Sequence, residues 1–171
     1  MKILNEPQWS QAIPIKFADI IYKIHDDCLA TLRDFGIKTK RGKDRKLLQL
    51  LGTDWGRSID VDLWVKATQF RVNQHIEQRQ SFDLLDEFYV IIDDCRFPNE
   101  LDAFPDAVKI RLESSEKLRL ERAESWGDSQ HESETALDGH VHSFDMIIQN
   151  ENINIDQMVS VALNKIQKVE R

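Results

Sequence analysis

Two adjacent carboxylates end an apolar run of the sequence. Asp93 and Asp94 directly follow residues 88–92, which read Phe-Tyr-Val-Ile-Ile, and lead into the segment 95–100. A β-branched and aromatic run without polar alternation is typical of a strand covered on both faces. Carboxylates at the tip of such a strand can hold Mg²⁺, or its water shell, against a polyphosphate. In the alternative interpretation they only cap the next helix and pair with Arg96.

A second polar cluster begins on a predicted helix at 114–124. Arg119 and Arg122 are three residues apart, so they share one helix face. Two guanidinium groups in this position can both donate hydrogen bonds to phosphate oxygens during phosphoryl transfer. Surface pairing with Glu116 or Glu121 explains the same spacing equally well.

Histidines are concentrated in the one long irregular stretch that the pattern predicts, 125–143. His131 has no second histidine four residues on, so the zinc-protease helix pattern fails. Ser133 lacks the flanking glycines of a nucleophile elbow. His140 and His142 could join His131 around a metal, but no cysteine or regular spacing supports such a site. The sequence therefore assigns no metal ligands.

Length and composition predict one globular domain over residues 1–171, with 41% apolar residues, six glycines and four prolines. A formal net charge of −7 argues against a general nucleic-acid-binding surface. Cys28 and Cys95 have no metal spacing and are expected to be reduced. No membrane span or signal peptide is visible, which predicts a cytoplasmic protein without membrane contact.

Hydrophobic periodicity predicts strands that alternate with helices. The expected strands are 12–17, 88–92, 107–112 and 145–149. The expected helices are 18–35, a short buried one ending at Gly52-Thr53-Asp54, one from Asp60 through Phe70, and 98–104, 114–124 and 153–168. This alternation predicts an α/β fold with a mainly parallel sheet.

Six ordered motifs cover nearly the whole chain. They are Lys16-Phe17-Ala18-Asp19, the segment 45–54, Asp62-Leu63-Trp64-Val65, the segment 92–100, His131-Glu132-Ser133-Glu134 and Ile148-Gln149-Asn150. In order and spacing they resemble the phage deoxynucleoside monophosphate kinases, which are relatives of adenylate kinase. The resemblance implies a three-layer P-loop NTPase-like fold that transfers the γ-phosphoryl group of ATP to a (deoxy)nucleoside monophosphate with Mg²⁺. For a phage-encoded chain, it also implies the host bacterial cytoplasm.

The same resemblance implies roles for individual residues. The monophosphate side would be lined by Asp19, Arg45, Gln49, Thr53, Asp54 and Trp64, and the acceptor would be faced by Arg96 and Glu100. The catalytic residues would be Asp93, Asp94, Arg119 and Arg122. A lid-like segment, 114–143, would close over the phosphates and would include His131, Ser133 and Glu134.

The chain departs from these kinases at its beginning. The family starts with a strand and a Gly-rich phosphate loop, whereas residues 1–6 look like the tail of the helix that should follow that loop. Gly42-Lys43-Asp44 imitates the end of such a loop without its strand or its earlier glycine. By the resemblance, the missing strand would lie between 88–92 and 107–112. These two strands are therefore expected either to pair directly or to leave a slot that a second copy or another protein completes.

The matching motifs and the missing phosphate loop together are compatible with three functions. The first is a nucleoside monophosphate kinase that is impaired or inactive as an isolated chain, because the phosphate loop supplies most of the positioning in phosphoryl transfer. The second is a catalytically retired kinase fold that serves a phage as a nucleotide-binding or host-protein-binding factor. The third is a purely structural subunit.

Overall fold

The structure is a computed structural model that describes residues 12–39, 42–82, 88–122, 132–151 and 154–169. It divides into two compact units. The N-terminal unit is Gln11–Cys95, and the described residues of the C-terminal unit begin at Arg96. Each unit contains helices and one pair of parallel strands, so the α/β class and the parallel pairing are confirmed. The P-loop arrangement and the single domain stay predictions.

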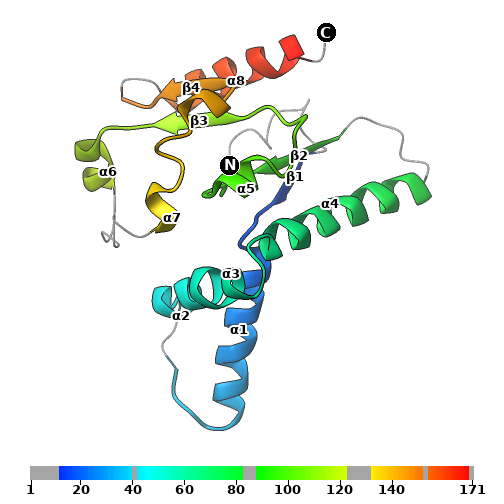
Figure 1. Cartoon of the computed structure of the whole chain (residues 1–171), viewed down its shortest axis with the longest axis vertical. Coiled ribbons are helices and arrows are strands. Elements are labelled where there is room, and N and C mark those ends of the chain that lie inside the picture. Colours follow the sequence, from blue (N-terminus) through cyan, green and yellow to red (C-terminus); the bar gives the residue numbers. More distant parts are fainter. Residues whose placement is uncertain (1–11, 40–41, 83–87, 123–131, 152–153, 170–171) are drawn as a thin grey trace. The chain divides into compact units, whose positions relative to one another are not determined.

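The sheet of the N-terminal unit joins the two ends of that unit's sequence. Strand β1 (Ala12–Ile15) pairs in parallel with β2 (Tyr89–Ile92), and Ile15 lies opposite Ile92 (Figure 1). Three residues separate β1 from helix α1 (Asp19–Asp34), which ends close to its predicted limit. Ile15 and Phe17 are almost completely buried, so the end of β1 is anchored in the core of this unit.

A continuous helical run follows α1. It consists of α2 (Arg45–Gln49), the π-helix η3 (Leu50–Trp55) and α3 (Gly56–Ile59). The predicted helix end at Gly52-Thr53-Asp54 is therefore wrong. The indole Nε1 of Trp64 donates a hydrogen bond to the carbonyl of Gly52 (2.6 Å), and the Trp64 ring packs against Gly56. This tertiary contact outweighs the local breaking signal of the glycine.

Helix α4 (Leu63–Ser81) is longer than the predicted helix from Asp60 through Phe70. Its buried residues are Trp64, Val65, Thr68 and Val72. Phe70, which the sequence pattern assigns to the apolar face, is 64% exposed. Asp60 lies in the turn before the helix, where its Oδ1 accepts a hydrogen bond from the Asp62 N–H (2.9 Å).

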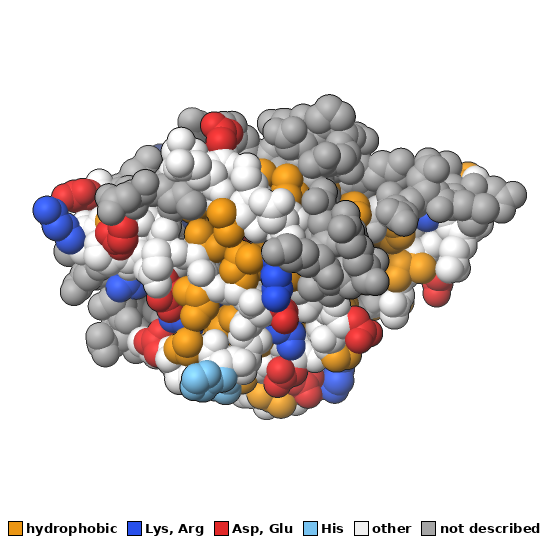
Figure 2. Space-filling model, turned by 90° about the horizontal axis from the view of Figure 1, so that it is seen from above, with side chains coloured by type: hydrophobic (Ala, Val, Ile, Leu, Met, Phe, Trp, Pro, Cys, Tyr) orange, Lys and Arg blue, Asp and Glu red, His pale blue; other side chains and the backbone are white. Residues whose placement is uncertain are grey.

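The C-terminal unit has its own parallel pair. Strand β3 (Ile110–Glu113) pairs with β4 (Met146–Gln149), and Ile110 lies opposite Met146. The helices of this unit are α5 (Pro98–Leu101), α6 (Glu116–Arg122), α7 (Glu132–Thr135), the 3-10 helix η4 (Val141–Ser143) and α8 (Ile155–Val169). Among its described residues, the buried hydrophobic ones are Phe97, Leu101, Ile148 and Ala162. Figure 2 shows hydrophobic side chains that remain exposed between charged ones.

The stretch predicted as irregular, 125–143, contains the short helices α7 and η4. Residues 123–131 of this part of the chain lie outside the described residues. Arg111 on β3 fixes the segment after α7, because its guanidinium donates to the carbonyl of Leu137 (2.8 Å) and reaches the carboxylate of Asp138 (3.3 Å). This clamp depends on contacts across 26 residues of sequence, which local periodicity cannot reveal.

The described strands thus form two sheets of two strands each. Direct pairing of the strand at 88–92 with the strand at 107–112, one of the two expectations from the sequence, is absent from the described ladders. The other expectation, completion by a partner, stays a prediction.

Substituting Gly56 with Ala tests the packing of the helical run. A Cβ at this position would lie 2.2 Å from Cζ2 of Trp64 and 2.7 Å from the carbonyl oxygen of Leu51. We expect Gly56→Ala to lower the free energy of unfolding by about 1–3 kcal/mol, because the Trp64 ring must move. Gly139→Ala is the matched control, since no atom lies within 4 Å of its added Cβ. Urea unfolding measures both, and equal stabilities of the two variants would contradict this account.

Candidate functional site

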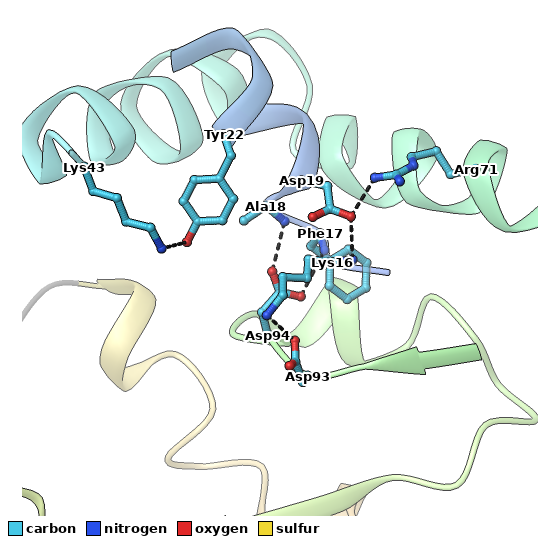
Figure 3. A network of polar contacts seen from close by, with 9 residues as sticks. All are labelled: Lys16, Phe17, Ala18, Asp19, Tyr22, Lys43, Arg71, Asp93 and Asp94. Carbon is cyan, nitrogen blue, oxygen red and sulfur yellow. Dashed lines mark hydrogen bonds and ion pairs between the residues drawn. The ribbon is translucent and has the colours of Figure 1, made fainter. Parts of the chain in front are cut away.

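The carboxylate of Asp94 connects the ends of β1 and β2. Its Oδ1 accepts a hydrogen bond from the Phe17 N–H (2.9 Å) and its Oδ2 accepts one from the Ala18 N–H (3.0 Å) (Figure 3). Both N–H groups belong to the turn between β1 and α1. A side chain from the end of one strand therefore fixes the backbone at the end of its neighbour. In open α/β sheets, this edge is where ligands bind.

Burial raises the pKa of Asp94 above its ordinary value of 3.8, and the neighbouring charge of Asp93 adds to this effect. The hydrogen bonds from Ala18 and Phe17 act in the opposite direction, because they stabilise the ionised carboxylate. Burial is the largest of these influences, so removal from water decides the direction.

Asp93 forms an ion pair with the other end of the same turn. Its Oδ1 lies 2.7 Å from Nζ of Lys16, and both side chains are about two-fifths exposed, at 40% and 41%. The hydrogen bond to Asp93 raises the pKa of Lys16, so this amine keeps its charge. The two adjacent aspartates thus have different partners. Asp94 accepts hydrogen bonds from backbone N–H groups, and Asp93 forms an ion pair with a partly exposed lysine.

The start of α1 carries a third carboxylate. Oδ2 of Asp19 accepts a hydrogen bond from the backbone N–H of Lys16 (3.1 Å) and lies 2.6 Å from Nη1 of Arg71 on α4 (Figure 3). The structure therefore brings Asp19, Asp93 and Asp94 into one cluster, which also contains Lys16 and Arg71. Sequence reasoning did not assign a role to Arg71, because its pairing depends on the packing of α4 beside the start of α1.

A buried histidine fixes the next element of the N-terminal unit. His25 is only 2% exposed, its Nε2 accepts a hydrogen bond from the backbone N–H of Asp44 (3.1 Å), and its Nδ1 lies 2.8 Å from Oδ1 of Asp26. Asp44 in turn caps α2, since its Oδ1 accepts hydrogen bonds from Lys46 and Leu47. The start of the helical run is therefore tied to α1. A lone histidine on a helix gave no sequence signal for this role.

The monophosphate-side residues expected from the resemblance belong to three elements: Asp19 starts α1, Trp64 lies on α4, and the other four lie on the helical run. Arg45, Gln49 and Thr53 follow one another at four-residue spacing, which places them on one face. Asp54 is exposed on another face, and Trp64 is buried with its indole N–H bound to Gly52. Near the first turn of α2, Nζ of Lys43 lies 3.5 Å from the hydroxyl of Tyr22 and 4.5 Å from its ring centroid.

The remaining expected site residues belong to the C-terminal unit. Glu100 is buried, and its Oε2 accepts hydrogen bonds from the backbone N–H groups of Arg96 (2.8 Å) and Phe97 (3.1 Å), which caps the start of α5. Arg119 is exposed on α6. The side chains of Arg122, Ser133 and Glu134 and the whole of His131 lie outside the described residues.

Mg²⁺, which the resemblance implies, does not fit the carboxylates at this edge. Both oxygens of Asp94 accept backbone hydrogen bonds, and Asp93 is paired with Lys16. Nowhere in the described part of the chain do three or more His, Cys, Asp or Glu residues form a group that could hold a metal. Of the groups at this edge, Lys16 can bind an anionic ligand in exchange for Asp93, because their ion pair is partly exposed.

No protein-family model, curated protein or solved structure matched this chain. Among the described helices, none is long and apolar enough to span a membrane.

Substituting Asp94 with Asn tests the bridge between the strand ends. The amide of Asn offers one acceptor in place of two, so one backbone N–H loses its partner. We expect the free energy of unfolding at neutral pH to fall by about 1–3 kcal/mol.

The pH dependence of the free energy of unfolding tests whether burial raises the pKa of Asp94. A folded-state pKa above the ordinary 3.8 means that the folded protein binds this proton more tightly than the unfolded chain does. Stability should therefore rise, relative to Asp94→Asn, as the pH falls through the raised pKa, and this gain should be complete below 3.8. Denaturant unfolding of both proteins between neutral and acid pH measures the difference. A difference that shrinks on acidification would show that burial does not dominate.

Proposed function

We propose that this chain is a nucleoside monophosphate kinase-like protein whose N-terminal unit binds a (deoxy)nucleoside monophosphate. One observation carries the proposal: Asp94 clamps the turn after β1 at the carboxyl end of a parallel strand pair, and cationic side chains lie beside it. This is the edge at which α/β proteins bind their ligands. The resemblance of the motifs at 16–19, 45–54 and 92–100 to the phage kinases supplies the ligand class.

The helical run supports a phosphate contact at Arg45. Its side chain is exposed and forms no ion pair with another described residue. Gln49 and Thr53 lie on the same face and offer an amide and a hydroxyl for further hydrogen bonds. A phosphate could therefore bind Arg45 without first displacing a carboxylate of a described residue.

The second candidate function, a retired kinase fold that binds a nucleotide or a host protein, has its own supporting observation. Both cations of the strand-edge cluster are already neutralised, Lys16 by Asp93 and Arg71 by Asp19. A catalytic centre for phosphoryl transfer needs positive charge that is directed at the transferred group. These two ion pairs therefore favour a protein that binds a nucleotide or a host protein over one that catalyses phosphoryl transfer.

Calorimetric titration with deoxynucleoside monophosphates tests the proposed site. We expect binding by the whole chain, and we expect Arg45→Ala to weaken it by about 1.5–3 kcal/mol, the scale of a hydrogen bond to a charged group. Lys46→Ala is the matched control, because Lys46 is the adjacent exposed cation on a different face of α2. Equal losses in the two variants would indicate general electrostatic attraction and would contradict the assignment of Arg45.

A coupled assay for ADP release tests catalysis. The printed sequence contains no Gly-rich phosphate loop, and the loop's backbone N–H groups and lysine provide the main grip on the nucleotide phosphates. We expect residues 1–171 to show little or no ATP-dependent transfer to a nucleoside monophosphate, even with Mg²⁺ and at high protein concentration. Robust turnover would contradict this expectation and would direct attention to Lys43 as a substitute phosphate grip.

A further inference from the structure

His25 is a buried titratable residue that lies beside the start of the helical run. Its side chain is 2% exposed, yet both ring nitrogens have hydrogen-bond partners. Nε2 accepts a hydrogen bond from the backbone N–H of Asp44 (3.1 Å), so this nitrogen carries no proton. The single proton of the neutral ring therefore lies on Nδ1, which donates it to Oδ1 of Asp26 (2.8 Å). The two contacts thus require one tautomer of the uncharged ring.

The hydrogen bond to His25 holds the residue that caps α2. Oδ1 of Asp44 accepts hydrogen bonds from the backbone N–H groups of Lys46 and Leu47, both at 3.1 Å. The backbone of Asp44 is therefore tied to α1, and its side chain is tied to α2. Arg45 is the next residue and the first of α2. The position of Arg45 relative to α1 consequently depends on how Asp44 is held.

Two further described contacts join this region to α1, and both constrain the first turn of α2 less directly. Gly52 approaches the side chain of Ile21, but it lies in η3, beyond the end of α2. Nζ of Lys43 lies 3.5 Å from the hydroxyl of Tyr22 in an exposed contact (Figure 3). The buried hydrogen bond to His25 is therefore the main restraint on this turn.

We propose that His25 is a positioning residue for the phosphate contact at Arg45, and that protonation of its ring releases the first turn of α2. This inference rests on the proposed function, in which Arg45 contacts the monophosphate. A proton on Nε2 would turn the acceptor into a donor, so two N–H groups would face each other in place of a hydrogen bond. Histidine is the residue type whose charge ordinarily changes between about pH 5 and 8, so mild acid is the condition to test.

Charged groups around the ring act on its protonation together with burial. Asp26, whose side chain is 78% exposed, favours the charged ring through its contact with Nδ1, whereas burial favours the neutral ring. The elements that pack beside α1 here carry five further charged residues, which are Lys43 and Asp44 on the segment before α2, Arg45 and Lys46 on α2, and Asp54 on η3. The carboxylate of Asp44 is directed at the N–H groups of α2, so it does not replace the lost acceptor.

The free protein tests the tie between His25 and Asp44 without a ligand. Nitrogen NMR of the ring identifies the protonated nitrogen, and amide hydrogen exchange measures the protection factor of the Asp44 N–H. We expect Nε2 to be unprotonated at neutral pH, and we expect the protection factor to fall at least about fivefold on acidification to about pH 5.5. A proton on Nε2 at neutral pH, or a protection factor that does not change with pH, would overturn the proposal.

Two variants separate His25 from general effects of acid. His25→Gln offers an acceptor that does not titrate in this range, so the protection factor of the Asp44 N–H should agree at the two pH values within about twofold. His75→Gln on α4 is the matched control and should respond to acid as the unchanged protein does. A loss of protection in His25→Gln as large as in the unchanged protein would contradict the role of the ring.

Calorimetric titration with a deoxynucleoside monophosphate tests the coupling to Arg45. The phosphate of the ligand titrates in the same range, so the quantity to compare is the ratio of the dissociation constants at about pH 5.5 and about pH 7.5. We expect this ratio to be about five- to tenfold larger for the unchanged protein than for His25→Gln, the scale of one lost hydrogen bond. Equal ratios would overturn the proposal. Absence of binding by every protein at both pH values would contradict the proposed function instead, and the amide exchange would still confirm or overturn the release of the first turn.

Discussion

The geometry of the N-terminal unit depends on the two backbone hydrogen bonds that Asp94 accepts. The N–H groups of Phe17 and Ala18 lie where β1 has ended and α1 has not begun, so neither element supplies an acceptor for them. Asp94 supplies both acceptors and is partly removed from water, which raises its pKa. Because this turn is fixed, Lys16 and Asp19 on either side of it are held near Asp93 and Arg71.

Two glycines set a second constraint, which acts on the packing of the helical run. Gly52 and Gly56 allow the helical run to approach α1 and α4 closely, and the Trp64 indole fills the space beside Gly56. The first turn of the run is held by another route, since buried His25 binds the backbone of Asp44, which caps α2. The face of the run that carries Gly52 and Gly56 thus packs against α1 and α4. The other side chains of the run are partly or fully exposed and can contact a ligand or a partner.

The sequence predicts the strands and most helices because their signals are local. The apolar run at 88–92 and the helical spacing over 18–35 need no knowledge of the rest of the chain. The continuation of the helical run past Gly52 could not be predicted, because it depends on Trp64, twelve residues away. For the site, the end of the apolar run indicates Asp93 and Asp94, whereas Asp19 is indicated only by the resemblance of its motif. Their partner Arg71 was missed, since it meets Asp19 only when α4 packs.

Asp93 and Asp94 are indistinguishable in the sequence, and the structure separates them. The pair between Asp93 and Lys16 is about two-fifths exposed on both sides, so exchanging the carboxylate for another anion costs little. Asp94 cannot be exchanged in this way, because releasing it leaves two backbone N–H groups without acceptors. A phosphate that approaches this edge would therefore compete with Asp93 for Lys16 while Asp94 keeps the turn in place. The adjacent carboxylates thus combine an exchangeable counter-ion with a fixed structural bridge.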